Sequence, residues 1–277
     1  MTIEEKLARI QDFRPIDDVF FEALAQSKEF CQEILRVIME DEYLTVEDVI
    51  VQSDKRNLYG RSVRLDALCA LGSGAKANIE VQRSDNDNHL KRARFNAASI
   101  TVKDSDTGTT FDEVLDLYII YISEFDFIKE GRTIYHVDKV LRETGTVVDD
   151  GLHEIFVNTE VDDDSDIAEL MSCFLQKEVS NSRFPVFSSE VRRLKETEGG
   201  AESMCEIMER YTKEAELEGL KKGKEQGLQQ GLQQGLQEGR ILAIQNMIEM
   251  EIPESKILSK YLKEEYEEAA ASMPIEI

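Results

Sequence analysis

Two short runs of alternating apolar residues, joined by a glycine-rich turn, most restrict the folds open to this chain. Residues 63–71 are apolar at every second position, and residues 77–82 begin three positions after the turn residues Gly72, Ser73 and Gly74. A period of two is typical of a strand with one buried face, and glycine supplies the backbone freedom that a tight turn needs. We therefore predict that the two runs form an antiparallel hairpin.

The segments around this hairpin predict an α/β fold. Residues 17–40 have apolar side chains at helical spacing and predict one or two helices, residues 88–102 predict another, and residues 166–179 predict a helix with Ser165 as its N-cap. The other predicted strands share β-branched and aromatic side chains and comprise residues 45–52, 114–122, 134–141 and 154–158. The strongly apolar run 114–122 is typical of a central strand covered on both faces. This order of elements indicates a sheet between layers of helices.

Charge narrows the range of ligands. The net charge of −24 argues against a protein that coats nucleic acid with its whole surface, because such binding depends on lysine and arginine. Residues 55–103, however, contain ten basic residues against four acidic ones. We expect an anionic ligand at this segment, although a solvated surface of mixed charge explains the pattern equally well.

Cysteine spacing and hydropathy indicate where such a chain would work. The four cysteines lie far apart in the sequence, which does not match zinc-ligand spacing and suits buried thiols in a reducing compartment. No stretch is long and apolar enough to span a bilayer, and the acidic N-terminus does not resemble a signal peptide. We therefore expect a cytoplasmic protein with no membrane partner.

Two acidic residues lie on the same face of the predicted hairpin. Asp66 is near the middle of the first strand, and Glu80 is on the second strand after thirteen intervening residues. Facing residues on neighbouring antiparallel strands are about 5 Å apart, so the hairpin brings the two carboxylates close together. They repel each other unless a cation lies between them, and hard oxygen ligands select Mg²⁺ or Mn²⁺. The spacing predicts a metal site that could activate a water for attack on a phosphate.

Further polar side chains surround the predicted pair. Gln82 lies two residues after Glu80 on the same strand face, where its amide can orient a water or a phosphate but supplies no charge. Arg92 and Arg94, on the helix that follows, could hold a phosphate or could be ordinary solvated residues. We expect His89 to be a capping or exposed residue at the start of this helix rather than a catalytic base.

The sequence resembles the PD-(D/E)XK nuclease superfamily and, more narrowly, the PD-(D/E)XK nuclease family transposases, which are related to recombination-promoting nucleases. The resemblance rests on the spacing of Asp66 and the Glu80-Val81-Gln82 triplet, on the basic helix in KRARFN, and on the segment PIDDVF at residues 15–20, and it covers residues 14–195. It implies a restriction-endonuclease-like αβββαβ core, in which a mixed sheet is flanked by helices.

The resemblance also implies roles for individual residues. Asp66 and Glu80 would be metal ligands, and Asp17 matches an acidic position that assists the metal, although it could instead be a helix N-cap and Asp18 is its rival for either role. Gln82 occupies the position where the superfamily usually has lysine. The implied activity is that of a Mg²⁺- or Mn²⁺-dependent DNA endonuclease, a hydrolase of phosphodiester bonds that acts in DNA recombination or mobility. The alternative is a catalytically degenerate module of the same fold that acts in binding or self-assembly.

The sequence changes in character near its C-terminal third. Glycine recurs at every fourth position from Gly219 to Gly239, and four leucines each follow a glycine by one position: Leu220, Leu228, Leu232 and Leu236. On a helix this spacing makes a slowly drifting stripe, while each glycine costs an isolated helix about 1 kcal/mol relative to alanine. The segment is therefore either a flexible linker or loose helix, or a helix through which residues 217–240 form a homo-oligomer.

These patterns divide the chain into three parts. We predict a nuclease-like domain over residues 1–197, a repeat helix or linker over residues 198–240, and a short helical segment over residues 241–277. The last segment should be interrupted near Pro253, because proline cannot continue a helix.

Overall fold

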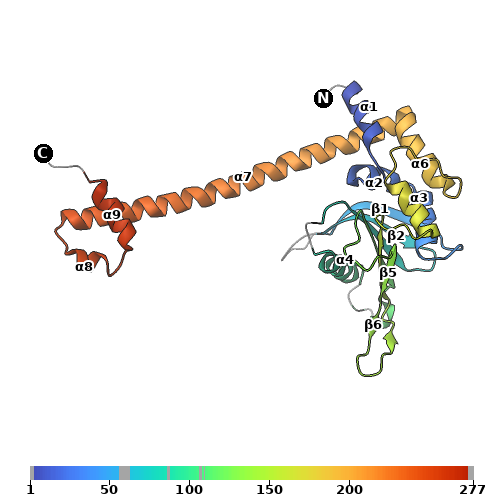
Figure 1. Cartoon of the computed structure of the whole chain (residues 1–277), viewed down its shortest axis with the longest axis horizontal. Helices are drawn as coiled ribbons and strands as arrows, with labels where there is room; N and C mark the ends of the chain where they lie inside the picture. The colour runs from blue at the N-terminus through green and yellow to red at the C-terminus, as the bar shows by residue number, and fades with distance from the viewer. Residues whose placement is uncertain (1–2, 56–62, 86–87, 106–107, 109, 274–277) are drawn as a thin grey trace. The chain divides into compact units, whose positions relative to one another are not determined.

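A six-stranded mixed sheet forms the centre of the fold (Figure 1). The computed structural model describes residues 3–55, 63–85, 88–105, 108 and 110–273. In spatial order, the strands are β1 (Val46–Lys55), β2 (Val63–Leu71), β3 (Lys76–Gln82), β4 (Leu117–Ser123), β8 (Leu152–Asn158) and β5 (Ile134–Val137). Two short strands, β6 (Lys139–Val140) and β7 (Val147–Val148), form a separate ribbon.

The predicted hairpin is confirmed as the antiparallel pair of β2 and β3. The apolar run 114–122 supplies β4, which lies inside the sheet between β3 and β8 and is parallel to both. β4 begins at Leu117, later than predicted, because a short 3-10 helix, η1 (Phe111–Glu113), occupies the chain before it. The predicted strand over residues 134–141 is divided into β5 and β6.

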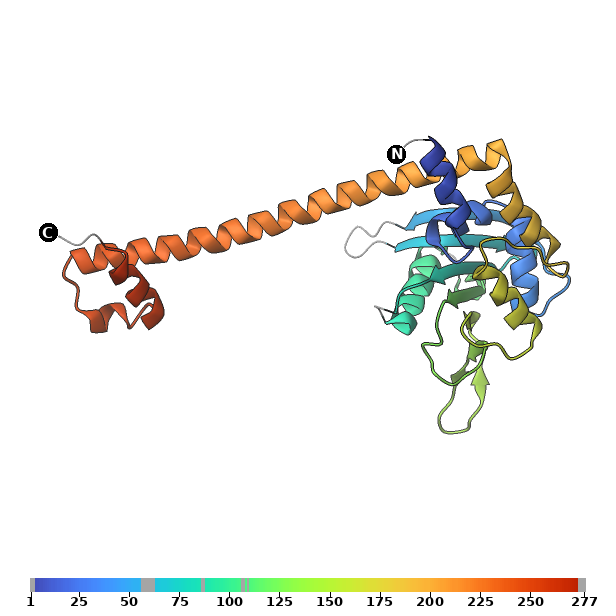
Figure 2. The same cartoon turned by 45° about the horizontal axis from the view of Figure 1, so that its top comes forward.

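Helices cover both faces of the sheet (Figure 2). α4 (His89–Asp104) packs on one face, where its alanines meet Leu68, Ile119 and Tyr121. The other layer consists of α2 (Asp18–Ala25), α3 (Lys28–Ile38), α5 (Asp166–Phe174) and α6 (Pro185–Glu196). The sequence predicts α2, α3 and α4 but neither α6 nor the N-terminal α1 (Ile3–Asp12).

α5 ends at Phe174, five residues before the predicted end at position 179. Its N-cap is confirmed, because the Ser165 hydroxyl accepts a hydrogen bond from the Ala168 amide. After α5 the chain is held by Lys195, whose Nζ donates to the carbonyl oxygen of Lys177 at 2.6 Å and to those of Gln11 and Phe13 at 2.9 and 2.7 Å. Lys195 thus ties the backbone after α5 to the N-terminal segment.

The chain divides into two units, Met1–Arg210 and Tyr211–Ile277. The glycine repeat lies within α7 (Glu198–Glu249), so it is helical rather than an irregular linker. α8 (Glu254–Ile257) and α9 (Lys263–Ala271) follow a break at Pro253. In the second unit, Ile244, Ile257 and Ala269 form a small buried core. None of the helices in the described residues has the length and apolar character that a bilayer span requires.

Candidate functional site

Asp66 and Glu80 meet where β2 and β3 separate. The two strands pair from Ala70 and Lys76 to Ala67 and Ile79, and one further step in this register places Asp66 opposite Glu80. Each carboxylate bonds the backbone of the other strand: Glu80 Oε1 accepts from the Asp66 amide at 3.3 Å, and Asp66 Oδ2 accepts from the Val81 amide at 3.0 Å. The structure thus brings the two acids together, and their role as metal ligands stays a prediction.

Burial raises the pKa of both carboxyl groups of this pair. Glu80 is 0 % exposed, and its Oε1 also accepts a hydrogen bond from the Asn78 side chain at 3.0 Å. Burial and the negative charge of Glu80 raise the pKa of Asp66 well above its usual range. Burial also raises the pKa of Glu80, and the hydrogen bond from Asn78 and the charge of Arg92 offset this only in part. Both carboxylates are therefore costly to ionise without a nearby cation.

Arg92 supplies a positive charge beside the pair. Its Nη1 donates to Gln82 Oε1 at 2.7 Å, and its Nη2 lies 3.6 Å from Glu80 Oε2. The other end of the Gln82 amide donates to the Ser84 carbonyl at 2.8 Å, which fixes its orientation. Burial alone would lower the pKa of Arg92, but surrounding negative charge, that of Glu80 most strongly, raises it. Gln82 is uncharged, and the guanidinium bound to it comes from α4.

The N-terminal acids divide between two environments. Asp17 accepts a hydrogen bond from the Arg14 amide at 2.7 Å and forms an ion pair with Arg83 at 2.7 Å. Asp18 instead acts on the pair, because its charge contributes to the raised pKa of Asp66. Burial raises the pKa of Asp18 itself, and the charges of Arg92 and Arg83 partly offset this. The two acids thus have different partners, and the assisting role of Asp17 stays a prediction.

The remaining predicted basic residues lie elsewhere. Arg94 is exposed, and its charge acts on Glu154. Burial raises the pKa of Glu154, and the charges of Lys139 and Arg94 offset this in part. Successive helix positions are about 100° apart. Arg94, two positions after Arg92, therefore points to a different side of α4. Of the basic segment, Lys76 pairs with Asp104 at 2.9 Å. Four of its basic side chains lie outside the described part of the chain: Lys55, Arg56, Arg61 and Arg64.

His89 differs from the sequence expectation. It is neither exposed nor the cap of α4, because it is only 4 % exposed and the Asn88 side chain performs the capping by accepting from the Lys91 amide at 3.0 Å. Its Nδ1 lies 2.8 Å from the Tyr121 hydroxyl, and its Nε2 lies 3.0 Å from Asp85 Oδ1. Sequence spacing could not reveal this contact, because Tyr121 comes from β4, thirty-two positions further along the chain.

The donor set can be compared with the requirements of a divalent metal. Among the described residues, no group of three or more His, Cys, Asp or Glu side chains is arranged to hold a metal ion. Mg²⁺, however, is commonly bound through only one or two carboxylates, with water as its other ligands. Glu80 Oε2 is buried and makes no hydrogen bond within the described part of the chain. Its one close positively charged neighbour among the described residues is Arg92, 3.6 Å away, and the pair thus fits a two-carboxylate Mg²⁺ site.

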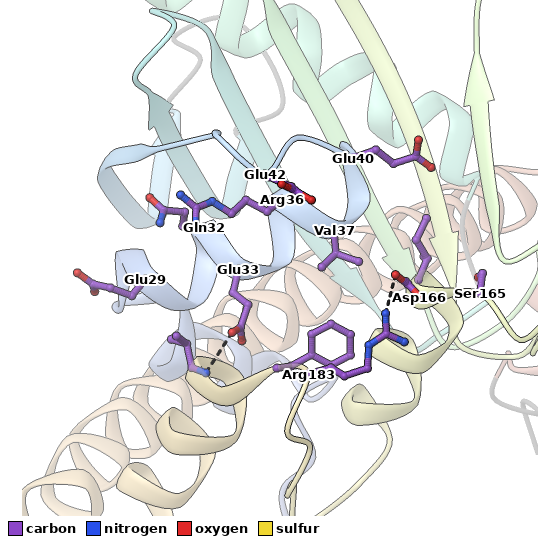
Figure 3. Close-up of a pocket in the computed structure, with 13 residues that line it drawn as sticks. Glu29, Gln32, Glu33, Arg36, Val37, Glu40, Glu42, Ser165, Asp166 and Arg183 are labelled. Atoms are coloured by element: carbon purple, nitrogen blue, oxygen red, sulfur yellow. Dashed lines mark hydrogen bonds and ion pairs between the residues drawn. The ribbon is translucent and has the colours of Figure 1, made fainter.

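A cavity of about 760 Å³ lies apart from this pair (Figure 3). Its walls come from α3, the start of α5 and the residues before α6, and most of its charged side chains are acidic: Glu29, Glu33, Glu40, Glu42 and Asp166. Glu33 bonds the backbone at the start of α6, and Arg183 pairs with Asp166. Because an acidic surface repels phosphate, this cavity is a poor site for a nucleic acid.

Comparison with known families places most of this domain in one family. A model of the family described as PD-(D/E)XK nuclease family transposase matches residues 16–169, more than half of the chain. The matched span contains both paired acids, Gln82 and Arg92. Searches of curated proteins and of solved structures gave no significant match. On the family match, the chain belongs to the PD-(D/E)XK nuclease family transposases.

Proposed function

We propose that this protein is a Mg²⁺-dependent endonuclease that hydrolyses phosphodiester bonds in DNA during recombination or mobility. The observation that carries the proposal is the contact between Asp66 and Glu80 at the separation of β2 and β3, beside Arg92. On this proposal α3, β1 to β3, α4 and β4 form a restriction-endonuclease-like αβββαβ core, and the catalytic domain comprises residues 1–197.

In the proposed reaction Asp66 and Glu80 hold the metal, with Asp17 or Asp18 as an outer acidic group. When bound, Mg²⁺ supplies Lewis acidity toward a phosphoryl oxygen and activation of a water. The fixed Gln82 amide orients the Arg92 guanidinium, which binds the phosphate and compensates for the missing lysine. Arg94 is exposed and would contact only a more distant part of the DNA backbone.

Plasmid nicking by the full chain tests this function. We expect conversion of supercoiled to open-circular DNA in Mg²⁺ or Mn²⁺ and none in a chelator, with Asp66→Ala inactive under all conditions. Cleavage by Asp66→Ala at the wild-type rate would rule out the proposed site. Cleavage that is unaffected by the chelator would rule out dependence on a divalent metal.

A second candidate function, self-assembly through residues 217–240, rests on the repeat in α7. A Cβ atom placed on any of the six repeat glycines from Gly219 to Gly239 would have no described atom within 4 Å, apart from its chain neighbours and its own helix backbone. The four leucines beside them are 61–75 % exposed: Leu220, Leu228, Leu232 and Leu236. Six glycines weaken an isolated helix by roughly 6 kcal/mol relative to alanine. We propose that a second copy of this helix provides the compensating contact.

The period of the repeat predicts the geometry of such a dimer. Four residues rotate a helix by about 40° more than one full turn, so the glycine stripe winds around the helix axis. A repeat longer than 3.6 residues per turn favours a right-handed supercoil. Identical stripes on both copies allow their backbones to approach closely at glycine, with leucine packing beside the contact.

Replacing Gly227, Gly231 and Gly235 with alanine distinguishes an assembly helix from a loose one. Each substitution should favour the isolated helix by about 1 kcal/mol, yet together they should convert a dimer to a monomer by blocking close approach. Light scattering measures the mass, and circular dichroism measures the helix content. As a control, Gly199→Ala lies outside the repeat and should leave the mass unchanged. A wild-type chain that is monomeric at high concentration would contradict self-assembly.

A further inference from the structure

A cluster of four charged side chains joins the N-terminal segment to the ends of β3 and β4. The cluster, which we call the charged clamp, consists of Arg14, Asp17, Arg83 and Glu124. Arg14 binds both oxygens of Glu124, with Nη1 2.8 Å from Oε1 and Nη2 3.3 Å from Oε2. Arg83 bridges the two acids, because its Nε donates to Glu124 Oε2 at 3.1 Å and its Nη1 lies 2.7 Å from Asp17 Oδ1.

The clamp holds a fixed geometry better than a single surface ion pair does. Each acid contacts both arginines, since Arg14 Nη2 also lies 3.6 Å from Asp17 Oδ1. An isolated exposed pair contributes little to stability, but bidentate geometry and a network of several charges are exceptions to this rule. Burial alone would raise the pKa of Glu124, but hydrogen bonds from Arg14 and Arg83 lower it. The carboxylate that joins the two arginines is therefore ionised at neutral pH.

The N-terminal side of the clamp is anchored to the folded core. The carbonyl of Phe13 accepts a hydrogen bond from Lys195 at 2.7 Å, and the Ile16 amide donates to the last backbone carbonyl of α5 at 3.1 Å. These bonds hold the backbone on both sides of Arg14. Its guanidinium therefore reaches Glu124 from a fixed segment of chain.

The other side of the clamp fixes the backbone that carries Gln82. The Glu124 amide donates to the Gln82 carbonyl at 2.9 Å, directly after the last paired residues of β3 and β4. Arg83 is the next residue, and the Ser84 carbonyl accepts from the Gln82 side-chain amide at 2.8 Å. The oxygen of that same amide accepts from Arg92 at 2.7 Å. A continuous set of contacts thus extends from the clamp through Gln82 to Arg92.

We propose that the four residues of the charged clamp are positioning residues, which hold the Gln82 amide and, through it, the Arg92 guanidinium beside Glu80. Asp17 then serves the clamp rather than the metal, since its Oδ2 accepts from the Arg14 amide and its Oδ1 lies beside two guanidiniums. The effect on catalysis rests on the proposed endonuclease function. The order of the Gln82 amide, in contrast, is a property of the metal-free protein and can be tested separately.

A double-mutant cycle in the full chain tests this inference. Glu124→Gln keeps the size of the side chain but removes the charge that holds both arginines, and Gln82→Ala removes the amide through which the clamp acts. We expect Glu124→Gln to lower the kcat of plasmid nicking about tenfold in the wild-type background and less than about twofold in the Gln82→Ala background. If Glu124→Gln is too unstable to assay, Arg83→Gln, at the most exposed member of the clamp, should give a smaller effect with the same dependence on Gln82.

Nuclear magnetic resonance of the full chain labelled with ¹⁵N-glutamine tests the positioning without relying on cleavage. In a chelator, the Gln82 side-chain amide signals, identified by their loss in Gln82→Ala, should lie away from those of the exposed glutamines in the α7 repeat. In Glu124→Gln they should move to the position of these exposed glutamines, because the amide is no longer held. A clamp that contributed only to stability would leave the Gln82 signals where they are.

Mn²⁺ binding tests the assignment of Asp17 to the clamp. Asp17→Asn should change the Kd for Mn²⁺ less than about twofold, whereas loss of a metal ligand weakens binding about tenfold or more. A tenfold weaker affinity in Asp17→Asn would place Asp17 at the metal and overturn its assignment to the clamp.

Glu190→Gln is the matched control. Glu190 lies on α6 and forms an ion pair with Arg193 at 2.8 Å, so the substitution also removes one partly buried carboxylate from its arginine. It should leave kcat and the Gln82 signals unchanged, because neither residue belongs to the clamp.

Additive effects of Glu124→Gln and Gln82→Ala on kcat would overturn the inference, because a clamp that acts through Gln82 has no effect once the amide is absent. Unchanged Gln82 signals in Glu124→Gln would overturn it as well. A wild-type protein that does not nick DNA would reject the proposed function. In that case the Gln82 signals in chelator would still decide whether the clamp positions this amide, so the two failures are distinguishable.

Discussion

Replacing Asp66 with asparagine is expected to abolish Mg²⁺-dependent nicking and to make the metal-free protein more stable. Asparagine has nearly the same shape and can still accept the hydrogen bond from the Val81 amide, but it carries no charge to bind a metal. Loss of several kcal/mol of metal stabilisation corresponds to at least about a thousandfold fall in rate. Stability should rise by about 1 kcal/mol, because the cost of burying the charge of Asp66 and its repulsion by Glu80 are both removed.

The gain in stability should depend on pH in a defined direction. Because the pKa of Asp66 is raised in the folded state, the protonated carboxyl contributes stability below the usual aspartate value of about 3.9. That contribution is lost as the pH rises through the raised pKa. The advantage of Asp66→Asn over the wild type should therefore grow as the pH rises above about 4 and then become constant.

Thermal unfolding in a chelator over a range of pH measures this difference. Asp112→Asn, which alters an exposed carboxylate in η1, is the control and should show no such growth. A difference between Asp66→Asn and the wild type that stays constant with pH would mean that neither burial nor Glu80 raises the pKa of Asp66 in the folded protein.

Replacing Arg92 with alanine is expected to have the opposite effect on stability. It leaves two buried carboxylates without the cation 3.6 Å from Glu80 Oε2, and removal of one partner from a buried ion pair is strongly destabilising. Because about a third of the Arg92 side chain is exposed, we expect a loss of about 2 kcal/mol in chelator, below the range of about 3–5 kcal/mol for fully buried pairs. The nicking rate should fall about a hundredfold or more, as for other residues that stabilise developing charge.

Divalent ions should partly restore the stability of Arg92→Ala. A ligand stabilises a protein according to its concentration relative to its Kd, and Mg²⁺ in the variant binds two carboxylates that no longer pair with a guanidinium. Mg²⁺ should therefore raise the melting temperature of Arg92→Ala more than that of the wild type. Arg94→Ala, two residues along α4 and exposed, should match the wild type. If Mg²⁺ raised the melting temperatures of Arg92→Ala and Arg94→Ala by the same amount, the role given to Arg92 would be contradicted.

Local sequence patterns predicted the framework of the site well. The alternation around Asp66, the glycine turn and the apolar run of β4 are all local signals, and each specifies a strand whose neighbours follow from short connections. The meeting of Asp66 and Glu80 follows from the same signals, because hairpin register is set by the turn and by the alternating pattern.

Features that depend on tertiary packing could not be predicted in this way. The Arg92–Gln82 bond and the burial of His89 both require α4 to lie against β3 and β4, and nothing in the local sequence specifies that placement. The contacts that hold the chain after α5 come from Lys195, which lies on a helix that the sequence did not reveal. The sequence also could not distinguish the roles of Asp17 and Asp18, which are adjacent in the chain. Asp17 forms an ion pair with Arg83, whereas the charges of both Arg92 and Arg83 act on Asp18.

Titration of the full chain with Mn²⁺, followed by electron paramagnetic resonance or calorimetry, tests the central claim most directly. Glu80 and Asp66 are expected to bind one ion per chain with an affinity that weakens at least about tenfold in Asp66→Asn and in Glu80→Gln, while Asp112→Asn binds as the wild type does. Equal Mn²⁺ binding by the wild type and both site variants would contradict the claim that these two carboxylates share a metal ion.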